Sequence, residues 1–339
     1  MQKLTHKLLR NIIIASLLGF FVKSHSQTSG QLEEIGYLLG DALFYSEKYL
    51  IPATDAAVYQ ASSSWMISPK KKKVWTATFG LHGNLFFVPK SDRSFDIKNE
   101  DFNFFEIENQ TSATVPTAIG NDDRVYLIGD LDGEQIRLRT PTGIDQETMF
   151  YPYLMGAVEL PYGSELVVRY STRTQLKRGE YQVFGIGLKQ NLSQFFPKME
   201  EKNLHFALMG MYSNADMTFD FLDIQTQYGN LGINRISGLV DTYHLQLSVS
   251  KEIKRFEIMT NLIVNRSNFK YEVSGDKGSI EEILPIQDII NELLATIAEP
   301  KTNVLGEVSV RYQISKFYLQ NSIAFGKFVN ANIGIQYQL

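Results

Sequence analysis

The carboxyl-terminal stretch, residues 302–339, constrains the fold more than any other part of the chain. Apolar and polar residues alternate through it in three successive runs that are separated by very short turns. In the first run Val304, Val308 and Val310 share one face of an extended strand, while Glu307 and Arg311 share the other. This is a period of two, which is the side-chain period of a β-strand. Strands of about ten residues with one apolar face are typical of a transmembrane antiparallel β-barrel that meets lipid outside and water inside.

A soluble β-sandwich also alternates, but its strands are usually shorter, about five to six residues. The amino terminus favours the barrel. Lys3, Lys7 and Arg10 precede an apolar run at 11–22 and a small-x-small site that ends at Ser26, so residues 1–26 are predicted to be a secretory signal peptide. A membrane anchor is the alternative, but the apolar run is shorter than the ~18–20 residues of a span. We therefore expect export to the cell outer membrane, with outer-membrane lipid as a partner.

Charge and cysteine content narrow the function further. Residues 1–26 hold four basic residues and no acidic one, so their removal lowers the formal charge by four, from −4 to −8. An acidic chain is a poor partner for nucleic acid. The chain has no cysteine, so no disulfide framework stabilises it. A closed barrel, in which every strand edge is paired, supplies stability in another way.

Two domains are predicted after the signal. Residues 27–73 form a helical segment, with an amphipathic helix at 29–49 that breaks at Pro52 and a second short helix at 53–62. This segment is either a plug in the barrel or a periplasmic segment that anchors the first strand. Residues 74–339 form the barrel, and the first strand, at 74–88, carries Trp75, Phe79 and Leu81 on its apolar face.

The strand count is predicted as about 10–14: ten core strands, with a further pair possible in the segment 90–148. That segment contains a hairpin at 124–129 and 134–139. A second long segment, 271–301, carries a helical stripe from Ile283 to Ile297, with Pro285 either kinking the helix or starting it. If the last strand descends to the periplasm, the short turns are periplasmic and both long segments are extracellular. The barrel-assembly machinery is expected as a partner through the C-terminal strand.

The polar faces of the strands carry the candidate lumen residues. Either they form a polar path or a titrating gate, or they form an internal network that fills a narrow barrel. Four consecutive lysines at 70–73 either attract anionic lipid head groups or form a solvated turn. The predicted lumen-facing residues are His82, Glu165, Arg169, His205, His244, Glu257, Glu307 and Arg311.

The sequence gives no support to an enzyme. Catalysis by a nucleophile needs a base beside it. His244 and Ser248 share a strand face, but a spacing of four residues separates them by about 13 Å. We find no metal-ligand spacing and no phosphate-binding loop, so no catalytic residue, cofactor or metal is expected.

Two stretches carry a family resemblance. Residues 49–52 (Tyr-Leu-Ile-Pro) with Ser64-Trp65, and the turn at 185–197 with Gly185 and Gly187, resemble an uncharacterised family of bacterial outer-membrane barrels. That family is distantly similar to FadL-type transporters of hydrophobic compounds. The resemblance implies a plug in the lumen, a lateral exit for apolar ligands and a small hydrophobic molecule as a partner.

Two functions remain open. In the first, the barrel is a channel or transporter for small hydrophobic molecules. In the second, it does not transport but displays its extracellular loops in a secretion or surface-assembly complex. Apolar residues along a lumen path would favour transport, whereas the assigned polar faces are dominated by His, Glu, Arg and Asn.

Overall fold

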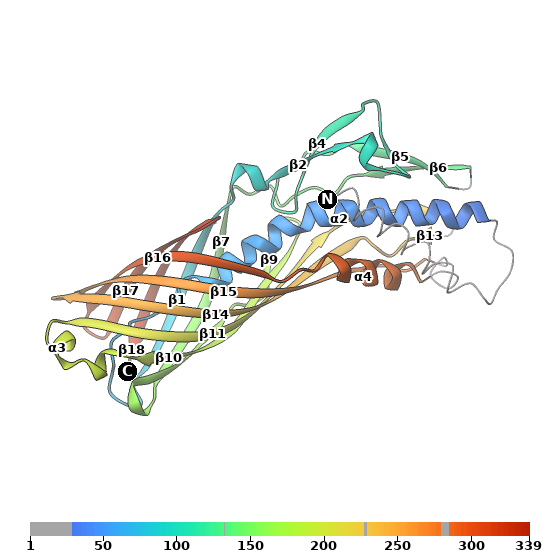
Figure 1. Ribbon diagram of the computed structural model, residues 1–339. Coiled ribbons are helices and arrows are strands. Elements are labelled where there is room, and N and C mark those ends of the chain that lie inside the picture. The colour runs from blue at the N-terminus through green and yellow to red at the C-terminus, as the bar shows by residue number, and fades with distance from the viewer. Residues whose placement is uncertain (1–28, 132, 227–228, 279–284) are drawn as a thin grey trace.

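Residues 29–131, 133–226, 229–278 and 285–339 are described by the computed structural model. The predicted signal peptide, residues 1–26, lies outside these ranges. The described chain is an all-β protein with a closed antiparallel barrel of ten strands, a long amino-terminal helix and an ordered lobe at one end (Figure 1).

The barrel closes because its first strand pairs on both sides, with the last strand and with the second barrel strand. Pairing of β10 with β11 completes the ring. Each barrel strand thus pairs with a neighbour on both sides over at least part of its length, so the sheet forms a closed ring, as a membrane-spanning sheet requires. The ten barrel strands are β1 (Ala77–Phe87), β7 (Thr148–Glu159), β8 (Ser164–Tyr170), β10 (Gly179–Asn191), β11 (Leu204–Asp220), β14 (Arg235–Ile253), β15 (Phe256–Ser274), β16 (Lys301–Ile314), β17 (Phe317–Phe325) and β18 (Val329–Gln338).

The alternation of apolar and polar residues in the sequence corresponds to the outer and inner faces of the barrel wall. On β1, Phe79 and Leu81 are 57% and 60% exposed, whereas Thr78 and His82 on the other face are 0% and 3% exposed. The outer surface is thus apolar and the interior polar, the reverse of a water-soluble sandwich. The prediction of a transmembrane barrel is confirmed.

The two ends of the barrel differ. At one end, here called the short-turn end, β14–β15 and β16–β17 are joined by turns in which Lys254 and Ser315 have φ of 57°. The same end carries η3 (Pro161–Gly163), η4 (Ser193–Phe195), α3 (Pro197–Glu200) and the carboxyl terminus (Figure 1). The opposite end, here called the long-loop end, carries the long connections.

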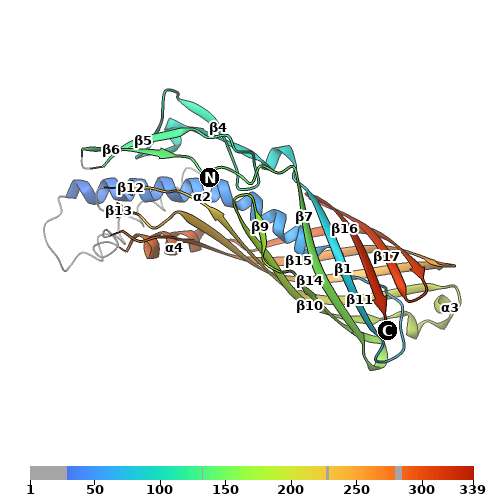
Figure 2. The same cartoon turned by 180° about the vertical axis from the view of Figure 1, so that it is seen from behind.

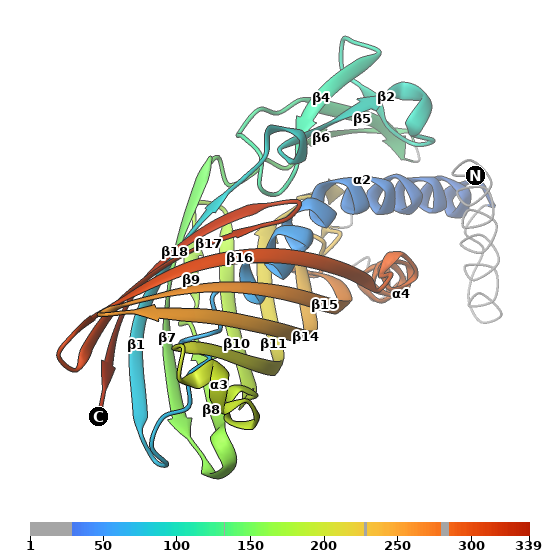
Figure 3. The same cartoon turned by 60° about the vertical axis from the view of Figure 1, so that its left-hand side comes forward.

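Helix α2 (Ser29–Ser62) enters the barrel from the long-loop end (Figures 1 and 3). The predicted break at Pro52 is wrong, because the helix continues through this residue. Packing holds both halves: Tyr49 and Val58, on either side of the proline, are fully buried. The Thr54 hydroxyl donates to the Ile51 carbonyl at 3.0 Å in the turn that follows the proline. None of the described helices is long and apolar enough to cross a membrane.

After α2 the chain runs on through the barrel as residues 63–73, here called the lumen segment, and reaches the start of β1 at the short-turn end (Figure 3). Helix and lumen segment together form a plug.

Three strands extend beyond the barrel at the long-loop end. β11, β14 and β15 have 17, 19 and 19 residues, whereas about 9–11 residues suffice to span a membrane. Their extensions pack on α2 and on α4 (Ile286–Ile297), which lies in the connection to β16. Pro285 directly precedes α4, so the predicted helix starts after the proline, and residues 279–284 lie outside the described ranges.

Residues 89–147 form a separate lobe on the side of α2 that is opposite to α4 (Figures 1 and 2). The predicted hairpin exists as β5 (Tyr126–Leu131) and β6 (Glu134–Arg139), but it belongs to the lobe and adds no pair to the barrel. The remaining short elements are η1 (Lys90–Asp92), β2 (Ser94–Lys98), η2 (Asn99–Asp101), β3 (Glu106–Ile107) and β4 (Ser112–Pro116) in the lobe, and β9 (Thr174–Leu176), β12 (Gln225–Thr226) and β13 (Gly229–Asn230) elsewhere.

Candidate functional site

The lumen segment has no regular secondary structure, so its backbone groups need partners from the barrel wall. Side chains of several strands supply them. Gln320 donates to the Met66 carbonyl at 2.9 Å, Asn191 donates to the Pro69 carbonyl at 2.8 Å, and Lys189 donates to the Ser68 carbonyl at 3.0 Å. The segment is therefore bonded to opposite sides of the wall.

Arg169 is the centre of this attachment. It is fully buried, and its Nη2 donates to the carbonyls of Ser63 and Ser64 at 2.7 and 3.0 Å and to the Tyr153 hydroxyl at 2.9 Å. Its guanidinium lies 4.7 Å from the Trp65 ring centroid and 4.1 Å from that of Tyr153. Cation–π contacts of this kind gain strength when they are desolvated.

Trp65 itself fits because the wall is thin beside it. A Cβ atom on Gly185 would lie 2.5 Å from the Trp65 ring. The glycine that blurs the strand pattern of β10 is thus a site where the plug approaches the wall closely.

Below Trp65 lies a buried cluster of charges. Glu165 pairs with Lys72 at 2.5 Å and with Lys189 at 2.7 Å, and Lys189 also lies 3.8 Å from Glu159. Lys189, Glu159 and Glu165 are at most 1% exposed. Two cations and two carboxylates neutralise one another here, as buried charges must.

Glu307 and Glu257 bind two further points of the lumen segment. Glu307 accepts from the Ser64 backbone N–H at 2.6 Å and from Asn261 at 2.7 Å. Glu257 accepts from the Ser68 hydroxyl at 2.7 Å and lies 3.6 Å from Arg311 Nη1.

The three predicted histidines lie apart from one another. His82 is within 3.2 Å of Asn332 Oδ1, and its ring stacks on Tyr153. His205 is 3.4 Å from Glu252. His244 Nε2 is 2.8 Å from the hydroxyl of Ser213, a cross-strand contact that the sequence did not indicate, and both residues are buried.

All eight predicted lumen residues thus lie inside the wall, at most 5% exposed, in several separate contact groups. Three further residues complete those groups and were not predicted to face the lumen: Lys72, Lys189 and Trp65. Continuing the alternation of β10 past Gly187 would have assigned Lys189 to the interior. Local sequence gave no comparable signal for Lys72 or Trp65, since their partners are distant in the chain.

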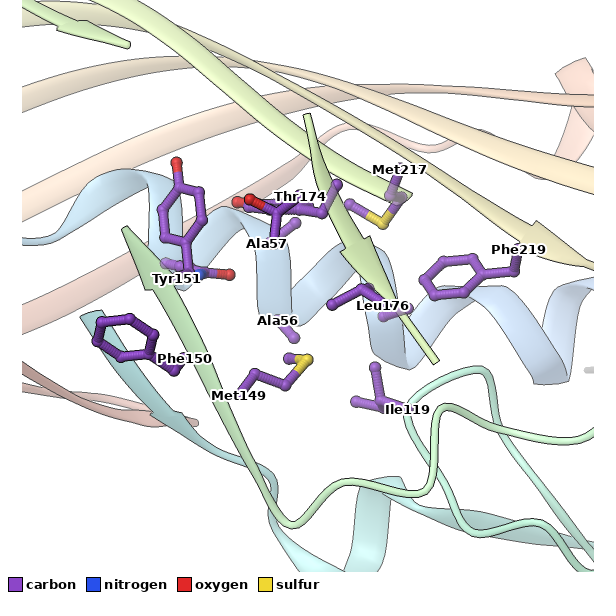
Figure 4. A pocket seen from close by; sticks show the side chains of 13 residues that line it. Ala56, Ala57, Ile119, Met149, Phe150, Tyr151, Thr174, Leu176, Met217 and Phe219 are labelled. Atoms are coloured by element: carbon purple, nitrogen blue, oxygen red, sulfur yellow. The ribbon is translucent and has the colours of Figure 1, made fainter. Parts of the chain in front are cut away.

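A pocket lies higher in the barrel, where α2 passes the upper ends of β7, β9 and β11 (Figure 4). Its cavity volume is about 30 Å³, so in this structure it has room only for water-sized molecules. The lining is mostly apolar, with Ala56 and Ala57 of α2 facing Met149, Leu176 and Met217 from the wall (Figure 4). The pocket is narrow, but two of its walls are methionines, whose side chains adapt easily.

The barrel wall is open beside this pocket. The ladder between β7 and β8 covers only Leu154–Glu159 of β7, because β8 ends at Tyr170. Above it, residues 148–153 pair with β1 on one side, while β9 pairs with β10. Phe150, on the outer face of β7 and 58% exposed, lines the same pocket as the buried Ala56. The lining of the pocket therefore includes residues of the barrel interior and one residue of its outer face.

Two tyrosines that line the pocket stand out. The hydroxyls of Tyr151 and Tyr181 are buried and have no hydrogen-bond partner among the residues that the structure describes. Such groups are costly to leave unsatisfied.

Comparison with known proteins places the whole chain. It belongs to a family of unknown function, DUF6588, whose model matches residues 1–339. No curated protein sequence matches the chain significantly.

Several solved structures share the barrel architecture. The translocator domain of the autotransporter NalP from Neisseria meningitidis is 8% identical, with 87% of this chain and 98% of that chain covered and a TM-score of 0.32. The outer membrane protease OmpT from Escherichia coli is 9% identical, with 82% and 100% covered and a TM-score of 0.28. The toluene transporter TodX from Pseudomonas putida is 9% identical, with 84% and 93% covered and a TM-score of 0.19. The three are an autotransporter domain, a protease and a toluene transporter, so FadL-type transporters are not singled out.

Proposed function

We propose that the protein is an outer-membrane barrel that passes small hydrophobic molecules between its long-loop end, on the cell surface, and the surrounding membrane. The observation that carries the proposal is the apolar pocket between α2 and the opening beside β7. Irregular or unpaired backbone at membrane depth is tolerated where it lines a cavity, and a lateral opening of this kind gives an apolar solute a route that avoids water.

The lumen below the pocket argues against a straight aqueous route. The lumen segment is bonded to the wall at Met66, Ser68 and Pro69, and the cluster around Lys189 and Glu165 fills the space beneath Trp65. A solute moving straight through would have to break these bonds. The lateral route leaves them in place.

The ligand class follows from the lining. Alanine, methionine, leucine and phenylalanine side chains favour an apolar body, and the unpartnered hydroxyls of Tyr151 and Tyr181 can each add a hydrogen bond. We therefore propose small apolar molecules that carry one or two polar groups. The proposal includes no covalent step, cofactor or metal.

Binding and uptake of an apolar fluorescent dye, N-phenyl-1-naphthylamine, by purified protein in liposomes test the proposal. Ala56→Phe fills the pocket, and Leu154→Phe on the lipid-facing surface of β7 is the matched control. We expect uptake to fall about tenfold in Ala56→Phe, since a blocked pocket loses its apolar contacts, and to be unchanged in the control. Equal uptake by both variants and the unaltered protein would contradict a route through the pocket.

Tyr181→Phe tests one of the two hydroxyls alone. It removes one hydroxyl without changing the shape of the pocket, and Tyr243→Phe on the outer surface is its control. Affinity for 1-naphthol, which has a hydroxyl, should fall about five- to tenfold in Tyr181→Phe. Affinity for naphthalene should not change.

A second function rests on a different observation. The lobe has buried apolar residues of its own, such as Ile97, Phe105 and Leu138, and an ordered lobe of this size is suited to display for partners. If the pocket variants leave dye uptake unchanged while replacement of residues 90–146 by a short linker abolishes a surface assembly, the display function is favoured. In either case we propose outer-membrane lipid as the surrounding medium and the barrel-assembly machinery, acting through β18, as the inserting partner.

A further inference from the structure

A second cavity, here called the basic bowl, occupies the short-turn end of the barrel. It encloses about 1040 Å³, including its open mouth. It is formed by the end of the lumen segment, the β14–β15 turn, the lower part of β16 and the carboxyl terminus. The carboxyl terminus and the β14–β15 turn, which line the bowl, lie at the opposite end of the barrel from β9, which lines the apolar pocket (Figure 1).

The lining carries a strong excess of positive charge. Seven of its residues are lysine or arginine, and the acidic groups are two glutamates and the carboxylate of Leu339. Lys70 pairs with Glu252 and Lys72 with Glu165. No acidic partner among the described residues is recorded for Lys73, Lys254 or Arg255. A concave surface lined by charges of one sign focuses its field on an ion of the opposite sign.

Arg311 provides a second and independent observation. Its side chain is buried, with 5% of the residue exposed. Its Nε donates to Gln336 at 3.0 Å, its Nη1 lies 3.6 Å from Glu257, and its guanidinium covers the Tyr318 ring at 3.5 Å. The Nη2 atom has no hydrogen-bond partner in the described part of the chain. An arginine held in place with a free donor in a basic cavity is suited to an oxyanion.

We propose that the basic bowl binds a compact polyanion with phosphate chemistry, held by Arg311 from within and by the lysine and arginine residues at the rim. Phosphate oxygens accept several charge-assisted hydrogen bonds at once, which matches a set of donors that converge on one cavity. Of the two alternatives for residues 70–73, the proposal favours attraction of anionic groups over a solvated turn, because these lysines line a cavity. This site is independent of the apolar pocket.

Two sources of that chemistry exist: a free phosphate compound in the water at this end of the barrel, and the head group of an anionic phospholipid. Calorimetric titration of the full chain in non-ionic detergent distinguishes them. Inorganic pyrophosphate is the first probe, and monomeric dihexanoyl phosphatidylglycerol is the second. The probe that binds more tightly identifies the source.

The test variant neutralises the rim as Lys73→Gln, Lys254→Gln and Arg255→Gln combined. The matched control, Lys198→Gln, Lys202→Gln and Lys316→Gln combined, removes three exposed charges at the same end that do not line the bowl. We expect affinity for the tighter probe to fall about tenfold or more in the rim variant and less than about twofold in the control. Affinity should also decrease with rising salt.

Arg311→Lys tests the buried donor. It keeps the charge but removes the planar donor set, so affinity should fall while folding, checked by circular dichroism and heat-modifiable gel mobility, is kept. If Arg311→Lys does not fold, the comparison of the rim variant with its control still tests whether the bowl binds the probe. Binding that falls equally in the rim and control variants, binding that is unchanged in both, or the absence of binding at millimolar concentrations of either probe would overturn the proposal.

Discussion

The plug is held by two different chemistries along its length. In the lower barrel, the lumen segment is fixed by hydrogen bonds and ion pairs from the wall, with Arg169, Glu307 and Lys189 as the main partners. At the long-loop end, α2 is fixed by apolar packing, in which Leu39 and Tyr49 are fully buried. One chain segment thus passes from a polar environment to an apolar one.

The difference follows from what surrounds each region. Inside the membrane the outer face of each strand must be apolar, so the inner face carries the polar residues, and an irregular segment there finds donors and acceptors. Beyond the barrel the extended strands and the lobe enclose a core in the usual way, with apolar residues inside. The apolar pocket lies where the two environments meet. Changes in the lower region should therefore cost more than changes in the upper one, because broken buried ion contacts leave uncompensated groups.

The largest effect is expected for Arg169→Met. The substitution removes the donor to the carbonyls of Ser63 and Ser64 and the cation between Trp65 and Tyr153. The free energy of unfolding in urea, measured in lipid vesicles, should fall by about 3–5 kcal/mol, as for other broken buried charge contacts.

Ion conductance through the vesicles should rise at the same time, because the lumen segment loses its central attachment. Arg173→Met is the control, since Arg173 is exposed and its ion pairs with Glu180 and Asp216 lie on the surface. If Arg169→Met is no less stable than Arg173→Met, the lower region is not held by its polar contacts.

The next effect concerns the approach of Trp65 to the wall. In Gly185→Ala the new Cβ would meet the Trp65 ring at 2.5 Å and the Tyr212 backbone carbonyl at 2.8 Å, neither of which has room to move. In Gly187→Ala the nearest atom is the flexible end of Met209. We expect Gly185→Ala to lower the free energy of unfolding by about 1–3 kcal/mol and Gly187→Ala to change it much less. Trp65 fluorescence should shift only in Gly185→Ala, and equal effects on stability would argue against a tight contact at Gly185.

Much of the barrel was predictable because lipid imposes a local pattern. The outward residues Phe79 and Leu81 and the inward residues Glu307 and Arg311 follow from alternation alone. The plug was less predictable. The pairing of Lys72 with Glu165 depends on how a segment threads through a ring, and no local pattern encodes that.

Strand length was also hidden from the sequence. Strands β14 and β15 are longer than the predicted strands of about ten residues, because apolar residues such as Val240 and Phe269 pack inward beyond the barrel. In these extensions one face of the sheet no longer contacts lipid and the other no longer contacts the lumen. The alternation of apolar and polar residues therefore no longer indicates which side chains are buried. The hairpin of the lobe was predicted, but the sheet to which it belongs was not. Turn residues determine that two strands pair, but they do not determine which sheet the pair joins.

A smaller effect is expected at the contact between α2 and the lobe. The carboxylate of Asp41, which is buried, accepts the backbone N–H groups of Asn103, Phe104 and Phe105 at 2.8–3.1 Å. Asp41→Asn leaves some of these donors unsatisfied, which should cost about 1–3 kcal/mol. The loss should appear as faster proteolysis of the lobe, while the barrel keeps its resistance, and loss of barrel resistance would contradict the separation of the two regions.

Asp41 should also make the stability of the lobe depend on pH. Burial raises the pKa of Asp41 above its ordinary value, and the three N–H donors only partly offset this. A raised pKa means that the folded state keeps a proton that the unfolded chain has released. The stabilising contribution is therefore complete below the unfolded pKa of about 4 and is lost as pH rises through the folded pKa. Protection of the lobe should decline over that window in the unaltered protein and stay level in Asp41→Asn, and identical pH profiles would show that another group titrates.

The smallest effect is expected on the outer surface of the lobe, at Arg137. Its guanidinium donates to both carboxylate oxygens of Glu108 at 2.9 Å and lies 3.5 Å from the Tyr126 ring centroid. The hydrogen bonds lower the pKa of Glu108, but both groups are in contact with water, which screens the pair. Arg137→Ala should leave the unfolding midpoint and the proteolysis rate of the lobe unchanged. A measurable loss would mean that the lobe depends on surface charge pairs, and the contrast with the buried contacts of Arg169 would then be one of degree, not of kind.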